Sequence, residues 1–158
     1  MHYPRRLLPL LALTVAPVAM AALFGSLFAG TMPADLGVHD GRLKACPDRP
    51  NCVNSQATDA RHVVAPLAFR GDAAAAMNAL AAVVAATPGA TIIAARENYL
   101  QATFTTPTMG FVDDVEVHAD VARKVIHVRS ASRLGHSDLD ANRNRVEALR
   151  RAFAAVNP

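Results

Sequence analysis

The chain lacks the short motifs that mark the common enzyme classes. It has no Gly-x-Ser-x-Gly elbow, no phosphate-binding glycine loop and no dinucleotide-binding motif. Its two cysteines are too few to complete a tetrahedral zinc site. No basic stripe is interleaved with aromatic residues, so nucleic acid is not an expected partner. The sequence therefore predicts no cofactor, no metal and, on balance, no enzyme.

Charge is also scarce, and it is unevenly placed. Only 18% of the residues are charged, whereas 52% are hydrophobic. Arg5 and Arg6 are the only charged residues before residue 31, and the rest of the chain is close to neutral. Between them and residue 31 lies Leu7–Gly30, which carries no charge at all. A helix over this run would be about 36 Å long, enough to cross a bilayer core of about 30 Å.

Two interpretations of residues 1–30 remain open. One is a signal peptide cut at Ala22, with Ala19 and Ala21 as the small residues before the cut. The other, which we favour, is an uncleaved transmembrane anchor, since cutting there would leave an exposed apolar tail. Basic residues before the run and none shortly after it place the C-terminal part outside the cytoplasm. The membrane is thus an expected partner through Leu7–Gly30.

Residues 31–158 have the size of a single domain. Cys46 and Cys52 lie at the two ends of a proline-stiffened loop. Outside the cytoplasm, two nearby thiols usually oxidise, so we expect a Cys46–Cys52 disulfide. A metal site helped by His39 or His62, and free thiols, are weaker alternatives.

The remaining segments alternate apolar patterns with turn residues. Thr31–Asn54 is expected to be irregular, and helices are expected over Ala73–Ala86 and from near Asp138 onward. The predicted strands are His62–Phe69, Ala90–Arg96, Tyr99–Thr106, Phe111–Ala119 and Lys124–Ala131. This order predicts an α+β fold: an antiparallel sheet of four to five strands with two helices packed on one face, preceded by an N-terminal membrane helix.

The hairpin formed by the last two strands allows a register to be predicted. With Ala119 opposite Lys124, Val117 lies by Ile126 and Val115 by Val128, so that these four share one face. The other face then pairs Glu116 with His127 and Asp114 with Arg129, which gives favourable charge pairs.

The last helix is expected to begin with Ser137 as its N-cap and Asp140 completing a pattern like a capping box. Its buried stripe is predicted to contain Leu139, Asn142, Val146, Leu149 and Phe153.

Polar residues gather where the last strand meets this helix. Arg129 and Arg133 alternate to one side of the strand, and Ser130 and Ser132 to the other. Arginines near the free N–H groups of a helix start favour an anion, such as a phosphate, a sulfate or a lipid headgroup. The predicted ligand-binding residues are Arg129, Ser130, Ser132, Arg133, Ser137, Asp138, Asn142, Asp113 and Asp114.

Two other interpretations of this block stay open. The aspartates Asp113, Asp114, Asp138 and Asp140 would neutralise the arginines in a purely structural network. A serine hydrolase would use Ser130, Ser132 or Ser137 as nucleophile, with His127 or His136 as base and Asp113 or Asp114 as its orienting group. No residue is predicted to be catalytic on these grounds.

Four stretches resemble one known family. They are residues 36–43 with Cys-Pro-Asp-x-Pro-Asn-Cys at 46–52, the strand at Tyr99, Phe-Val-Asp-Asp-Val-Glu at 111–116, and Arg-Ser-x-Ser-Arg at 129–133 with its continuation to Glu147. Together they resemble the family catalogued as domain of unknown function 1499, from about residue 36 to the C-terminus. The resemblance implies an extracytoplasmic or membrane-associated protein and supplies no reaction. We accordingly expect an inner-membrane protein with its domain in the periplasm.

Overall fold

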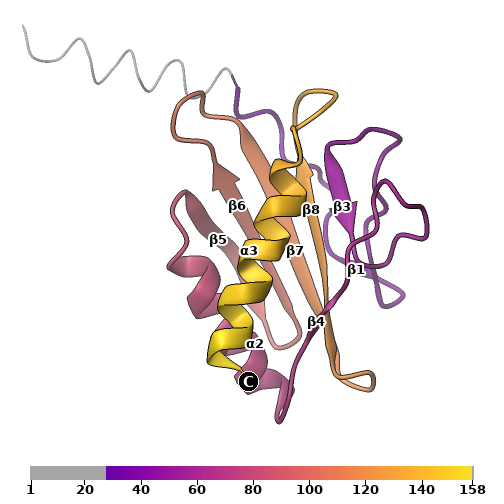
Figure 1. Cartoon of the computed structure of the whole chain (residues 1–158), viewed down its shortest axis with the longest axis vertical. Coiled ribbons are helices and arrows are strands. Elements are labelled where there is room, and N and C mark those ends of the chain that lie inside the picture. Colours follow the sequence, from indigo (N-terminus) through magenta and orange to yellow (C-terminus); the bar gives the residue numbers. More distant parts are fainter. Residues whose placement is uncertain (1–27, 158) are drawn as a thin grey trace, which may run out of the picture.

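The computed structural model describes residues 28–157 and contains two helices and two antiparallel sheets. The larger sheet has the strand order β3-β8-β7-β6-β5, and β4 pairs with the other end of β8. Figure 1 shows both helices lying across this sheet. The bounds are β3 Cys52–Asn54, β4 Leu67–Ala68, α2 Ala73–Ala85, β5 Ala90–Arg96, β6 Tyr99–Thr105, β7 Val112–Asp120, β8 Val125–Ser132 and α3 Ala141–Val156.

The α+β class is confirmed, and the sheet is larger than predicted. The segment expected to be irregular contains β1 (Val38–His39) and β2 (Arg42–Leu43), which form a small sheet of their own. It also contains β3, which pairs with β8. The strand predicted over His62–Phe69 was too long, because only Leu67–Ala68 forms a strand there, apart from an isolated bridge between Val63 and Asn54. Strands β1 to β4 are too short to show an alternating pattern, so no periodic signal in the sequence pointed to them.

The predicted membrane helix over residues 7–30 lies almost wholly outside the described residues. Within residues 28–157, neither helix has the length and apolar content that crossing a bilayer demands.

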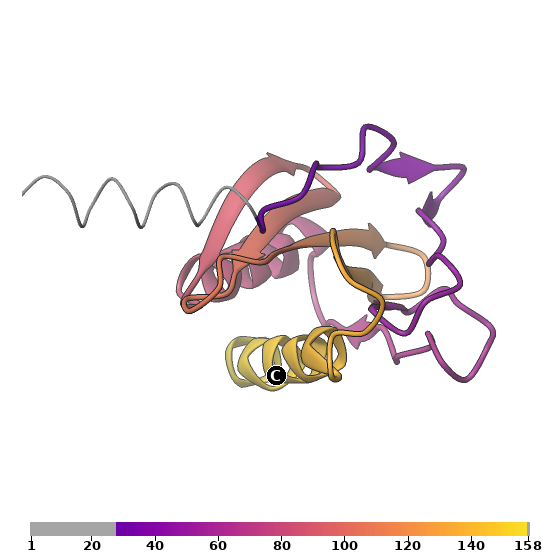
Figure 2. The ribbon, with the colours of Figure 1, turned by 90° about the horizontal axis from the view of Figure 1, so that it is seen from above.

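The core lies between the helices and one face of the large sheet. Met77 and Leu80 of α2 and Leu149 and Phe153 of α3 belong to the same buried cluster as Val117 of β7. Burial of these apolar side chains provides the main driving force for folding. The opposite face is covered by the segment that carries β1 and β2 (Figure 2).

The β7–β8 hairpin keeps the predicted faces but not the predicted register. Val117 lies opposite Val128 and Glu116 opposite Arg129, a shift of two residues from the expected pairing. The predicted pairs Glu116–His127 and Asp114–Arg129 were therefore wrong. A shift of two residues leaves every side chain on its own face because the strand repeat is two. Lys124 lies in the turn, with a positive φ of 54°, instead of opening the strand.

Helix α3 starts later than predicted. Ser137 is not its N-cap, because the helix begins at Ala141 and Asp140 occupies the cap position without a side-chain cap bond. Leu139 and Asp140 have φ values of 53° and 64°, a conformation that costs about 1–2 kcal/mol per residue with a Cβ. Leu139 is 90% exposed, so its predicted place in the buried stripe was wrong.

Candidate functional site

The polar block at the junction of β8 and α3 separates into two clusters, one on each face of the β7–β8 hairpin. Strand alternation sends Ser130 and Ser132 toward α3, and Arg129 and Arg133 to the opposite face. The predicted alternation is confirmed. One consequence is that the predicted ligand-binding residues do not converge on a single point.

The helix-face cluster consists of Asp113, Ser130, Ser132, Asn142 and Arg145. Arg145 donates from Nη2 to Asp113 Oδ2 at 2.5 Å and from Nη1 to Asn142 Oδ1 at 2.6 Å. Ser130 Oγ donates to the same Asn142 oxygen at 2.5 Å. Asn142 and Ser130 are fully buried, so each of these bonds replaces hydration that the groups lose on folding.

Asn142 is the centre of this cluster. Its Nδ2 donates to Ser132 Oγ at 3.0 Å, to Asp138 Oδ2 at 2.7 Å and to the backbone oxygen of Asn51 at 3.1 Å. Asp138 Oδ2 also accepts the backbone N–H of Asn142 at 2.8 Å. Thus the side chain that accepts a free backbone N–H in the first turn of α3 is Asp138 and not Ser137. Asn142 joins the helix to the segment before β3.

The opposite-face cluster consists of Tyr99, Asp114, Glu116, Arg129 and Arg133. Glu116 is fully buried. Its Oε1 accepts from Tyr99 Oη at 2.9 Å and from the backbone N–H of Gly37 at 2.7 Å. Arg129 lies 3.4 Å from Glu116, and Arg133 binds both oxygens of Asp114 at 2.9 and 2.7 Å.

The two arginines of this cluster differ in their surroundings. Burial lowers the pKa of Arg129 below its usual value, against the opposing pull of Glu116. The hydrogen bonds that Arg133 donates to Asp114 raise the pKa of Arg133. The Nε of Arg129 is buried and has no hydrogen-bond partner among the described residues. Burial, followed by the charge of Glu116, raises the pKa of Tyr99.

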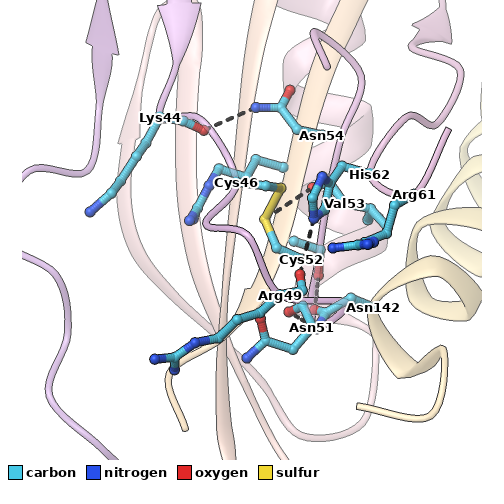
Figure 3. The surroundings of a disulfide bond; sticks show 12 residues. Lys44, Cys46, Arg49, Asn51, Cys52, Val53, Asn54, Arg61, His62 and Asn142 are labelled. Atoms are coloured by element: carbon cyan, nitrogen blue, oxygen red, sulfur yellow. Dashed lines mark hydrogen bonds between the residues drawn. A yellow bond between two sulfur atoms is a disulfide. The ribbon is translucent and has the colours of Figure 1, made fainter. Parts of the chain in front are cut away.

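The disulfide loop connects the covering segment to β3. Cys46 and Cys52 form the predicted disulfide. Around it, Asn54 donates to the backbone oxygen of Lys44 at 2.9 Å, and the Nε2 of His62 lies 3.0 Å from the backbone oxygen of Arg49 (Figure 3). The other ring nitrogen of His62 lies 2.8 Å from Asp59, and the hydrogen bond from His62 holds the pKa of Asp59 below its usual value.

A cavity of about 310 Å³ opens beside the helix-face cluster. Four predicted ligand-binding residues line it: Asp113, Ser132, Ser137 and Asp138. Its remaining wall is largely apolar and includes Phe111, Leu134 and Leu139. Asn142 and Ser130 lie beneath it in the helix-face cluster, while Arg129, Arg133 and Asp114 are on the other face of the hairpin.

A serine–histidine contact exists, but not among the predicted nucleophiles. Ser130 and Ser132 bond to Asn142 and not to an imidazole. Ser55 Oγ lies 3.1 Å from His127 Nδ1 and accepts the backbone N–H of Val128. Neither Ser55 nor His127 lines the cavity. Among the described residues, no group of three or more metal-binding side chains gathers.

Sequence reasoning missed three members of these clusters, Arg145, Glu116 and Tyr99, and also Asn51, whose backbone oxygen accepts from Asn142. Arg145 lies three residues after Asn142 on the same helix, a spacing that places both on one face, and this signal was available. Glu116 and Tyr99 come together only through the register of β6 and β7, and Asn51 only through β3. These three residues lie in the stretches that carry the family resemblance, but no local pattern placed them beside the predicted site.

Fold and clusters together define an α+β domain whose N-terminal covering segment is followed by a disulfide loop. A family model described as "Protein of unknown function (DUF1499)" matches residues 42–153, so the chain belongs to that family. No curated protein and no solved structure matches the chain. The match confirms the resemblance seen in the sequence and spans both clusters.

Proposed function

We propose that the protein is a membrane-tethered, extracytoplasmic binding module without catalytic activity, held in the inner membrane with its domain in the periplasm. The observation that carries this proposal is the Cys46–Cys52 disulfide, because such bonds persist in oxidising compartments. The uncharged Leu7–Gly30 after Arg5 and Arg6 supports the same location.

The cavity beside the helix-face cluster supports a binding role. It combines an apolar wall with a few polar groups, which is the usual composition of a ligand pocket. The hydroxyl groups of Ser130 and Ser132 are engaged with Asn142. A nucleophile needs an adjacent base to activate it, and no imidazole is bonded to either serine. Binding is therefore better supported than hydrolysis.

Reporter fusions at the C-terminus test the location. Alkaline phosphatase folds only outside the bacterial cytoplasm, so a fusion after residue 158 is expected to be active, and a green fluorescent protein fusion dark. Cys46 and Cys52 are expected to resist alkylation until a reductant is added. An inactive phosphatase with a bright fluorescent fusion would overturn the proposal. Retention in carbonate-washed membranes would distinguish an anchor from a cleaved signal peptide.

An anionic ligand, such as a phosphate or a lipid headgroup, is the second candidate. The observation that favours it is the buried Nε of Arg129, which has no partner among the described residues. Arg133 is less available to a phosphate, because it is already paired with Asp114 and the phosphate would have to displace that carboxylate.

Titration of inorganic phosphate and a short-chain phosphatidylglycerol into the full chain, in an uncharged detergent, tests this candidate. The variant pairs Arg129→Ala with Glu116→Gln, so that no buried carboxylate loses its counterion. We expect it to lose binding, while Arg123→Ala, in the distant β7–β8 turn, keeps it. Equal binding by both variants would exclude Arg129 as an anion ligand.

A further inference from the structure

Three segments that are distant in the sequence meet at one end of the domain. These are the chain at residue 28, the β6–β7 loop and the β8–α3 loop (Figure 1). The ring of Phe28 packs on the ring of Phe111 with 5.1 Å between their centroids. A Cβ on Gly30 would lie 2.8 Å from the Cβ of Arg133 and 2.9 Å from the Cγ of Leu134. The uncharged run therefore ends in close contact with both loops.

The same end exposes large apolar side chains. Met109 of the β6–β7 loop is 51% exposed, and Leu134 and Leu139 of the β8–α3 loop are 40% and 90% exposed. We call Met109, Leu134 and Leu139 the tether-end surface. Leu134 and Leu139 also belong to the wall of the cavity, together with Phe111. The exposed apolar surface and the apolar wall of the cavity are thus continuous.

The backbone keeps Leu139 in solvent at a cost. Both Leu139 and Asp140 adopt positive φ values, a strain that persists in proteins mostly at functional positions. An exposed leucine in a strained turn is an expected feature of a surface that another apolar phase covers.

We propose that the tether-end surface rests on the lipid bilayer, with Leu134 and Leu139 inserted among the acyl chains, so that the cavity opens to the membrane and its ligand is a phospholipid. This rests on the proposed tether. Consecutive Cα atoms are about 3.8 Å apart, so a domain whose residues 28–30 already contact Phe111 and Leu134 cannot move far from the end of the apolar run. Apolar side chains at the headgroup boundary add membrane affinity in proportion to the area that they bury.

The absence of tryptophan makes a direct test possible. The sequence has none, so Leu139→Trp in the full chain, reconstituted in phosphatidylcholine vesicles, reports from a single indole. Its matched control is Val121→Trp, because Val121 is 45% exposed in the β7–β8 turn at the other end of the sheet. Vesicles with bromine on the acyl chains quench an indole that lies among them. We expect about a twofold loss of emission for Leu139→Trp and little for Val121→Trp, as insertion to the acyl boundary requires.

Each outcome decides one claim. Equal quenching of the two indoles, in chains that co-float with the vesicles, overturns the bilayer contact and leaves the proposed tether standing. A chain that fails to co-float overturns the tether and the bilayer contact with it. A blue-shifted indole that bromine does not quench, with crosslinks between copies, would show that a second copy covers this surface. Leu134→Trp is a second reporter in case Leu139→Trp perturbs the turn, and circular dichroism checks the fold of every variant.

Discussion

The two faces of the β7–β8 hairpin use the same residue types for different purposes. On the helix face, Asn142 is bonded to Ser130, Ser132 and Arg145, and these polar contacts join α3 to the sheet. On the opposite face, Glu116 accepts a hydrogen bond from the backbone N–H of Gly37, and this bond holds the N-terminal cover against the sheet. Adjacent residues in the sequence, such as Asp113 and Asp114, therefore stabilise different layers.

The two clusters also differ in how completely their buried polar groups are hydrogen-bonded. Ser130, Asn142 and Asp113 all have short hydrogen bonds. In contrast, Arg129 has a loose contact to Glu116 and an unpartnered Nε. Buried ion pairs recover their desolvation cost only when the geometry is good and the remaining donors are satisfied. The Glu116–Arg129 pair is nevertheless the more deeply buried, with side chains 0% and 4% exposed against 7% and 15% for Asp113 and Arg145. Removal of one partner of this pair leaves the more completely buried charge, and is therefore expected to cost most.

The largest predicted effect follows from Glu116→Ala. This change leaves Arg129 buried without a carboxylate and removes the acceptor of Tyr99 and Gly37. We expect a loss of about 3–5 kcal/mol in the free energy of unfolding, measured by urea denaturation of the full chain in detergent. Hydrogen exchange at the amide of Gly37 should increase.

Two controls sharpen this test. Glu116→Gln keeps the shape and removes the charge, so it separates the ion pair from the hydrogen bonds. Glu147→Ala breaks a more exposed pair with Arg150 and is expected to cost less than about 1 kcal/mol. Comparable losses for Glu116→Ala and Glu147→Ala would contradict the structural role of the buried cluster.

On the helix face, Asn142→Ala is predicted to cost about 2–3 kcal/mol, because it leaves several buried polar groups without partners. Asn144 is exposed on the same helix, and Asn144→Ala is expected to change little. The thermal unfolding midpoints of the two variants provide the comparison. If Asn142→Ala unfolded like Asn144→Ala, the helix-face cluster would not be what joins α3 to the sheet.

How much of this could be read from the sequence depends on the range of each interaction. Alternation within β8 was enough to assign Arg129 and Ser130 to opposite faces, because that pattern is local. The register was displaced by two residues because nothing local showed that Lys124 belongs to the turn. Charge pairing then favoured His127 for Glu116 when the true partner is Arg129. A pattern of faces survives such a shift, but the identity of a partner does not.

The candidate site was predicted as one cluster for a related reason. The nine residues are close in sequence or on neighbouring strands, which made convergence plausible. Two hydrogen bonds with distant segments determine how the two clusters are arranged. The backbone oxygen of Asn51 accepts from Asn142, and the backbone N–H of Gly37 donates to Glu116. Both depend on how the segment before β4 folds over the sheet. Its strands are too short for a periodic pattern to reveal them.

A smaller effect, of the opposite sign, is predicted for Asp140→Gly at the start of α3. Asp140 has a positive φ and makes no side-chain cap bond, so glycine is expected to relieve strain and add about 0.5–1 kcal/mol of stability. Asp140→Ala keeps the Cβ and should bring no such gain. Urea denaturation compares the two variants, and an equal gain in both would show that the turn is not strained by the Cβ.

The smallest predicted effect is a pH dependence that belongs to the opposite face. Burial lowers the pKa of His127 below its usual value, against the pull of Asp120. The unfolded chain therefore binds a proton at His127 at a higher pH than the folded chain does. As a result, the stability that His127 contributes is present above about pH 6.5 and declines as the pH falls below that value. Unfolding free energies at pH 7.5 and pH 5.5 should differ less in His127→Gln than in the native chain.

His39 is exposed, and His39→Gln serves as the matched control. An equal decline in the native chain and in His127→Gln would mean that the contact between Ser55 and the His127 ring does not depend on the neutral imidazole.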